Sequence, residues 1–191
     1  MLRNDYLNLP DNWEGIWEQM MLNRSGASDE RTNRTYICSP CRSDSAEGML
    51  RNMKAARVYM FYTYIHFSGV PLAPHAYLPI LLNDHVKDER TLALSLGLRF
   101  IENCDKLFVC GDRLSYGMYG EIVEAVKREI PVLVFNQQVF EAIQAFLAQE
   151  GLPADAVQFE DSGLHSALMW SAEKLAQFWE VERNAQILPS H

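Results

Sequence analysis

Residues 106–135 read KLFVCGDRLSYGMYGEIVEAVKREIPVLVF, and this stretch decides the fold. It begins with a short apolar run, residues 107–110, and ends with a second, residues 132–135, which follows Pro131. Between the two runs, four apolar residues recur at helical spacing: Ile122, Val123, Ala125 and Val126. A strand, a helix and a second strand in this order are typical of the βαβ unit of a parallel sheet.

The expected turn of this unit, residues 111–120, contains three glycines and Ser115, and Glu121 follows at the expected start of the helix. A carboxylate there lies in the positive field of the helix N-terminus, beside backbone N–H groups without helical partners. In an open α/β sheet this turn also lies at the carboxyl end of a strand, where such folds bind ligands. Glu121 is therefore either a functional carboxylate or an ordinary residue of the first helical turn.

The chain has 191 residues, of which 48% are apolar and 22% charged, as is typical of a globular protein. Its formal net charge of −8 makes the backbone of a nucleic acid an unfavourable partner. The sequence has no run of about 18 apolar residues, and its first residues, MLRNDYLNLPDN, lack the hydrophobic stretch of a signal peptide. We therefore predict a cytoplasmic protein that binds neither nucleic acid nor a membrane.

The rest of the chain continues the alternation of strands and helices. Further strands are expected at residues 35–38, 70–73 and 157–159, and further helices at residues 47–67, 88–103, 139–149 and 164–184. This alternation predicts a flavodoxin-like or Rossmann-like α/β fold, with a parallel sheet of four to five strands and helices on both faces. The expected strand order is 2-1-3-4, with residues 157–159 as a fifth strand at the edge. In that order the ligand crevice opens between the first and third strands.

We divide the chain into three parts. Residues 1–34 form a polar N-terminal arm with a short amphipathic helix around Trp13 and Trp17, residues 35–160 form the α/β domain, and residues 161–191 form a C-terminal helix.

The crevice brings two turns of the chain together. The turn after the first strand offers Ser39 and Arg42, and the turn after the third strand offers Ser115 and the backbone of Gly117. Arginine, hydroxyl groups and N–H groups at a helix start suit a phosphate group. Glu121 cannot serve that phosphate, because like charges repel. It requires a neighbouring electrophile instead, such as the anomeric carbon of a sugar.

These two turns also carry a family resemblance. Residues 36–42, YICSPCR, and residues 115–121, SYGMYGE, resemble the nucleoside 2-deoxyribosyltransferase superfamily, most closely its 2′-deoxynucleoside 5′-monophosphate N-glycosidases. That branch has an aromatic-rich first strand, a turn that ends in arginine, and a serine six residues before its glutamate. Residues 71–75, PLAPH, and the pair Glu89-Arg90 resemble an uncharacterised phage and bacterial branch. The resemblance covers about residues 35–136.

The resemblance implies an enzyme that cleaves or transfers the N-glycosidic bond of a nucleotide or nucleoside. Glu121 would be the nucleophile that captures the sugar C1′, and Tyr36 would pack near the sugar or orient the glutamate. The implied substrate-binding residues are Ser39, Arg42, Ser115, Gly117 and Met118. No cofactor or metal ion is implied. A homodimer or larger homo-oligomer is implied, because related enzymes build their sites between subunits.

One departure from the family pattern bears on catalysis. The glycosidases carry an aspartate that assists departure of the base, eight residues before a position matched here by Asp105, and Gly97 stands in its place. His75 is the candidate substitute, because imidazole titrates near neutral pH, and a structural histidine is the alternative. Three hypotheses remain: an N-glycosidase or transferase, a nucleotide-binding protein without the chemistry, and a partner-binding domain.

The four cysteines are interpreted as reduced thiols. Cys38 and Cys41 have the C-x-x-C spacing of a redox pair, but residues 42–45 separate them from the following helix. A zinc site is not expected, because the sequence has no second closely spaced pair of ligands.

Overall fold

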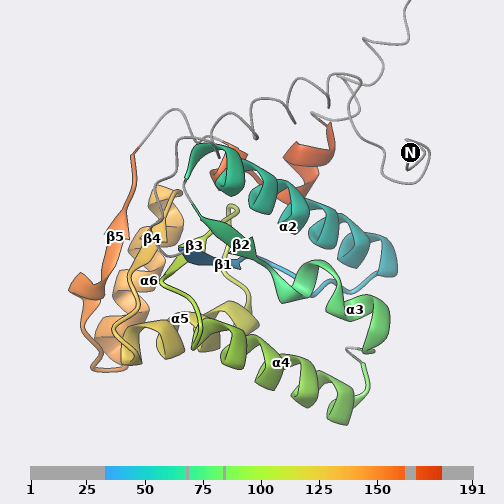
Figure 1. The fold of residues 1–191 in the computed structure, drawn as a ribbon, viewed down its shortest axis with the longest axis horizontal. Coiled ribbons are helices and arrows are strands. Elements are labelled where there is room, and N and C mark those ends of the chain that lie inside the picture. The colour runs from blue at the N-terminus through green and yellow to red at the C-terminus, as the bar shows by residue number, and fades with distance from the viewer. Residues whose placement is uncertain (1–32, 68, 84, 162–166, 178–191) are drawn as a thin grey trace, which may run out of the picture.

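A computed structural model describes residues 33–67, 69–83, 85–161 and 167–177. Its centre is a five-stranded, all-parallel sheet in the order β2-β1-β3-β4-β5 (Figure 1). The strands are β1 (Arg34–Cys38), β2 (Val70–Leu72), β3 (Lys106–Val109), β4 (Val132–Val134) and β5 (Val157–Phe159). The predicted α/β class, the strand order and the fifth strand are confirmed.

Helices cover both faces of the sheet. The longer ones are α2 (Ala46–His66), α4 (Lys87–Ile101), α5 (Tyr116–Lys127) and α6 (Gln137–Gln149). The shorter ones are α3 (Leu78–Leu81) and the 3₁₀ helices η2 (Pro74–Ala76) and η3 (Ala154–Ala156). α2 lies on one face, and α4, α5 and α6 lie on the other (Figure 1). Among the described residues, no helix combines the length and the apolar character that a membrane crossing requires.

Alternating side chains along the central strands divide the core into two layers. On β1, Tyr36 and Cys38 pack in the layer beneath α5 and α6, whereas Ile37 packs in the layer beneath α2. Successive residues of a strand point to opposite faces, so a continuous apolar run is buried on both sides. The sequence YIC of β1 therefore supplies both layers at once.

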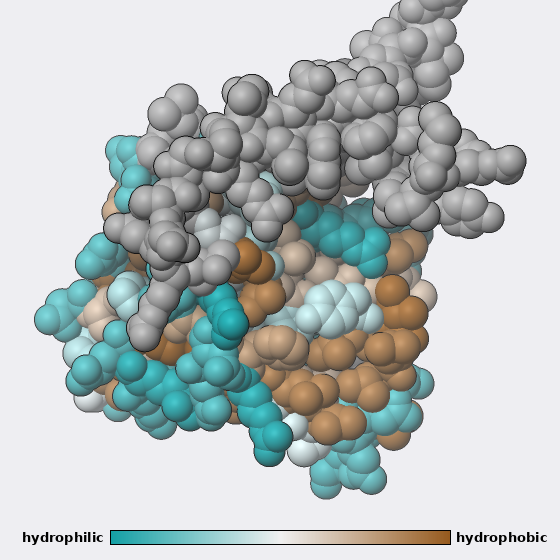
Figure 2. All heavy atoms as spheres, in the orientation of Figure 1, coloured by the Kyte–Doolittle hydropathy of each residue, from teal (hydrophilic) through white to brown (hydrophobic). Residues whose placement is uncertain are grey.

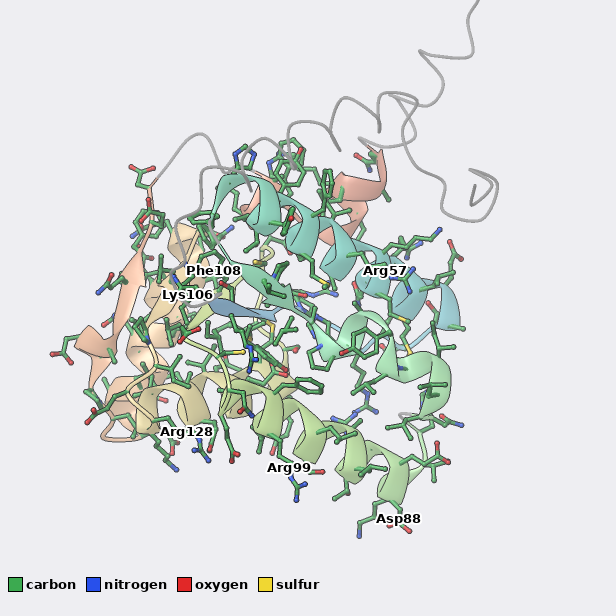
Figure 3. The ribbon with its side chains drawn as sticks, viewed as in Figure 1. Arg57, Asp88, Arg99, Lys106, Phe108 and Arg128 are labelled. Carbon is green, nitrogen blue, oxygen red and sulfur yellow. The ribbon has the colours of Figure 1, made fainter. Side chains whose placement is uncertain are left out.

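The α2 face is closed by aromatic rings and by residues 167–177. The ring of Phe108 on β3 (labelled in Figure 3) lies 4.8 Å from that of Phe67 and 5.1 Å from that of Phe135, both edge to face. The Tyr59 hydroxyl of α2 donates a hydrogen bond to the carbonyl of Trp170 at 2.6 Å. The amide of Gly111, which follows β3 with φ +99°, donates to the carbonyl of Leu168 at 2.8 Å.

The start of α5 differs from the sequence-based expectation. The helix begins at Tyr116, with Ser115 in extended conformation as its N-cap, so Gly117 and Gly120 lie inside the helix. Glu121 is therefore in the second turn of α5, away from the free N–H groups of the first turn. The prediction that Glu121 lies at the start of the helix was wrong.

Two further helical predictions need correction. Helical spacing with Leu96, Phe100 and Ile101 predicts that Leu92 points inward. In the structure Leu92 is 49% exposed, because the first half of α4 extends beyond the sheet (Figure 1). The expected C-terminal helix of residues 164–184 is not continuous where it is described: residues 167–169 form a 3₁₀ turn, and residues 172–177 form a helix. The Ser171 hydroxyl accepts a hydrogen bond from the Lys174 amide and caps that helix. The helix predicted around Trp13 and Trp17 lies outside the described residues.

Candidate functional site

The carboxyl ends of β1 and β3 lie side by side at the centre of the sheet. Cys38 is in register with Val109, and the amide of Cys110 donates to the Cys38 carbonyl at 2.9 Å. The chain runs from β1 outward to β2 and then returns to β3 on the other side of β1. This is the topological switch point, where open α/β sheets bind ligands.

Glu121 projects from α5 toward β1. Its Oε1 accepts a hydrogen bond from the Tyr36 hydroxyl at 2.8 Å, and the Cys38 thiol lies close enough to the same carboxyl group to influence its pKa. Tyr36 and Cys38 are two residues apart on β1, so both side chains leave the same face of the sheet. One strand therefore supplies two donors to one carboxyl group. Of the two roles expected for Tyr36, this geometry favours orientation of the glutamate.

Burial changes the acidity of all three side chains. Desolvation raises the pKa of Glu121 to about 7, while the hydrogen bonds from Cys38 and Tyr36 oppose the rise because they stabilise the ionised form. Desolvation, followed by the neighbouring Glu121 charge, raises the pKa of Tyr36 and of Cys38 well above their usual values. Both therefore stay protonated donors at neutral pH, whereas Glu121 is a mixture of acid and carboxylate. Such a perturbed carboxyl group is typical of functional sites.

Two glycines leave space beside this carboxyl group. Gly97 is buried in α4, and a Cβ there would lie 3.2 Å from the Tyr36 hydroxyl and 3.7 Å from Glu121 Oε1. Gly117 lies one turn before Glu121, and a Cβ there would meet nothing within 4 Å. Residues four apart share one face of a helix, so this open space borders the side of α5 that carries Glu121.

Ser39 and His75 form a second polar pair. Ser39 Oγ lies 2.7 Å from His75 Nε2, which joins the loop after β1 to η2 after β2. Desolvation lowers the pKa of His75 to about 4, so the imidazole is uncharged at neutral pH. The expectation that His75 titrates near neutral pH is therefore wrong, and at that pH it carries no extra proton to give to a departing base.

The other predicted residues lie on the loops or in the core. Arg42 is exposed on the loop after β1, which Asn52 holds by donating to the Cys41 carbonyl at 2.9 Å and to the Arg42 carbonyl at 3.4 Å. Ser115 is partly buried at the start of α5. Met118 is only 1% exposed and packs in the core.

The cysteines are free thiols with different surroundings. Cys38 contacts Glu121, whereas Cys41 Sγ lies 4.0 Å from the His75 carbonyl oxygen. Among the described residues, no group of three or more His, Cys, Asp or Glu side chains is placed to hold a metal ion. The sequence-based interpretation of Cys38 as a reduced thiol did not foresee its proximity to Glu121. The signal was its position two residues after Tyr36, on the same face of the strand.

Fold and site together define a flavodoxin-like α/β domain with a partly buried carboxyl group beside its switch point. The family described as "Domain of unknown function (DUF7768)" matches residues 33–135, and the chain belongs to this family. The matched segment extends from just before β1 to just after β4, so it contains every site residue described above. No curated protein matches the chain with significant similarity.

The raised pKa of Glu121 predicts a pH-dependent stability. Its folded-state pKa of about 7 lies above the ordinary value of about 4.3, so its contribution favours folding at low pH and is lost as pH rises through about 7. Relative to the wild type, Glu121→Gln should therefore gain about 2 kcal/mol in unfolding free energy between pH 5 and pH 8, measured by urea denaturation. Ile122→Val, which removes no titrating group, should change stability equally at both pH values. An equal effect of Glu121→Gln at both would contradict the raised pKa.

Proposed function

We propose that the chain is an enzyme of the N-glycosidase or deoxyribosyltransferase type, which cleaves the bond between base and sugar in a nucleotide or a nucleotide-derived metabolite. The observation that carries the proposal is the Glu121 carboxyl group, held by Tyr36 and Cys38 near the switch point, with open space over Gly117. The resemblance of residues 36–42 and 115–121 to the nucleoside 2-deoxyribosyltransferase superfamily supports it.

In the proposed reaction, ionised Glu121 attacks the sugar C1′ through one carboxylate oxygen. The bond from C1′ to the base nitrogen breaks, its electron pair leaves with the base, and the base takes a proton from water. Water or a second base then attacks C1′ and releases the carboxylate. Because the nucleophile must be ionised, the rate should rise with pH through about 7. The reaction requires no cofactor or metal ion, and its proposed setting is the cytoplasm.

The proposal assigns the substrate phosphate to the loops after β1 and β3. Arg42 supplies a guanidinium group that can bind two phosphate oxygens, and the first turn of α5, after Ser115, supplies backbone N–H groups. The bond between Ser39 and His75 fixes the serine hydroxyl at the end of β1. These groups would hold the phosphate while the sugar reaches Glu121.

A nucleotide-binding protein without turnover is the second candidate function. Gly97 favours it, because this residue stands where the glycosidases carry the aspartate that assists departure of the base. His75 does not replace that acid, because its imidazole is uncharged at neutral pH. Such a protein would sense or sequester a nucleotide and leave it intact.

Base release separates the two candidates. We expect the protein to release free base, detected by chromatography, from deoxynucleoside monophosphates or from NAD. Glu121→Ala should slow release by a factor of about 10³ or more, because the nucleophile is lost. Binding of an intact nucleotide by calorimetry, without release, would support the binding protein instead. Absence of both binding and release would exclude both functions.

The space beside Glu121 can be tested with two matched alanine variants of α5. Gly117→Ala and Gly120→Ala each add one methyl group where nothing lies within 4 Å, and each should stabilise the helix by about 0.5–1 kcal/mol. Only the Gly117 methyl group would lie on the side of α5 that carries Glu121, four residues away. We expect nucleotide affinity or base release to fall about tenfold in Gly117→Ala and to stay at the wild-type level in Gly120→Ala. Equal behaviour of the two variants would show that no ligand occupies this space.

We also propose that the protein forms a homodimer or larger homo-oligomer through an apolar face next to the site. Figure 2 shows apolar residues gathered over α3 and the neighbouring part of α4. On α3 and in the segment that joins it to α4, the exposed large apolar side chains are Tyr77, Ile80, Leu81 and Val86, and these four residues define this face. Such patches mark interaction surfaces. The start of α4 also carries both charge signs, in Lys87, Asp88, Glu89 and Arg90, so a two-fold related copy can pair opposite charges across it.

A charge placed on this face should break the assembly. Leu81 is 76% exposed, so Leu81→Lys should leave the fold intact and shift the protein toward monomer in sedimentation or light-scattering measurements. Met169→Lys, at an exposed apolar residue outside this face, should leave the assembly unchanged. A monomeric wild-type protein would overturn the proposed self-association.

A further inference from the structure

We propose that Cys38 is a positioning residue, whose thiol acts with the Tyr36 hydroxyl to hold the Glu121 carboxylate in the orientation that its reaction needs. The inference rests on the proposed function only in assuming that Glu121 reacts. The contacts of Cys38, and the experiment that tests them, do not depend on turnover.

The position of Cys38 leaves its thiol little freedom. The residue is completely buried, and its carbonyl accepts a hydrogen bond from the Cys110 amide at 2.9 Å, which fixes its backbone in the sheet. Cysteine has only one torsion between the backbone and its sulfur, so the thiol is limited to three staggered directions on this face of the strand. Cys38 packs in the same core layer as Met118 and Ile122, which flank Glu121 on α5. The sulfur therefore faces the part of the helix that carries the carboxyl group.

Two donors from one strand restrain the carboxyl group better than one. Tyr36 bonds Oε1 with a long side chain, and the short side chain of Cys38, on the same face of β1, brings its thiol to the same carboxyl group. A carboxylate bonded by both cannot rotate without losing a hydrogen bond. The helix on the other side adds no competing side chain, because Gly97 faces the pair with only its backbone. The Glu121 carboxyl group thus has Tyr36 and Cys38 on the side of β1 and no side chain from Gly97 on the side of α4.

The protonated state of the Cys38 thiol fits a hydrogen-bond donor and argues against a nucleophile or a redox group. Burial and the nearby Glu121 charge raise the pKa of the thiol well above its usual value, so it remains a donor throughout the neutral range. A thiol that stays protonated is a poor nucleophile and a poor redox group. Cys38 and Cys41 are both free thiols despite their C-x-x-C spacing.

A role in packing alone makes a different prediction from a role in positioning. If Cys38 only fills the core, serine should be as harmful as alanine or worse, because it buries a hydroxyl group. If Cys38 positions Glu121, serine should preserve the function, because its hydroxyl is also a donor. Cys110 provides the matched control: it is also completely buried, but its thiol approaches the Phe108 carbonyl and it packs in the opposite core layer.

The test is a ¹³C NMR titration of the Glu121 side-chain carboxyl group in the full chain. Removal of one donor destabilises the ionised form, so Cys38→Ala should raise the titration midpoint by about 0.5 pH unit or more. Cys38→Ser should leave the midpoint at or below that of the wild type, and Cys110→Ala should leave it unchanged. Tyr36→Phe should raise it as Cys38→Ala does, because it removes the other donor.

The outcomes separate this inference from the proposed function. An unchanged midpoint in Cys38→Ala, or an equal rise in Cys38→Ser, would overturn the role of Cys38 whether or not base is released. If Cys38→Ala does not fold, a midpoint of Cys38→Ser above the wild type overturns it. A shift as expected in a protein that releases no base would support the positioning role and contradict the enzyme. If base is released, Cys38→Ala should move the pH profile of kcat upward with little change in KM.

Discussion

The hydrogen bond between Tyr36 and Glu121 joins two parts of the chain that are 85 residues apart. It exists because the parallel order puts β1 beside β3, and α5 returns from β3 across the face of β1 that carries Tyr36 and Cys38. A carboxyl group removed from water is unfavourable as an anion unless donors meet it. The two donors of β1 partly compensate for that desolvation, which keeps the pKa of Glu121 near neutrality. The chemistry that we propose depends on this balance.

Much of the fold could be predicted from short-range patterns. The apolar runs of residues 35–38, 107–110 and 132–135, separated by helical repeats, are sufficient for a parallel sheet and its order. The start of α5 could not be predicted in this way, because Gly117 and Gly120 resemble loop residues in sequence. In the structure both adopt helical geometry after the Ser115 cap. Because the helix begins five residues earlier than the expected turn allowed, Glu121 lies in its second turn and not at its start.

The site was only partly predictable for a related reason. Adjacent strand ends meet at one edge of a sheet, so the meeting of the segments that carry Tyr36 and Glu121 follows from topology alone. The properties of His75 do not, because its lowered pKa depends on how closely neighbouring elements enclose the ring. Periodicity likewise cannot distinguish an apolar helix position that is buried in the core from one that is exposed, as Leu92 is. In both cases the sequence does not show how closely the neighbouring helices and loops pack against the side chain.

The bonds from Gly111 to Leu168 and from Tyr59 to Trp170 bear on where the domain ends. Leu168 and Trp170, whose carbonyl groups accept these hydrogen bonds, lie beyond residue 135, the last position of the family segment. The loop that leads from β3 to α5 is thus held by residues outside the segment that defines the family. Leu168 and Leu175 are also buried in the core layer beneath α2. A fragment cut to the family limits would expose apolar surface and lose that brace. The autonomous folding unit must therefore extend at least to residue 175.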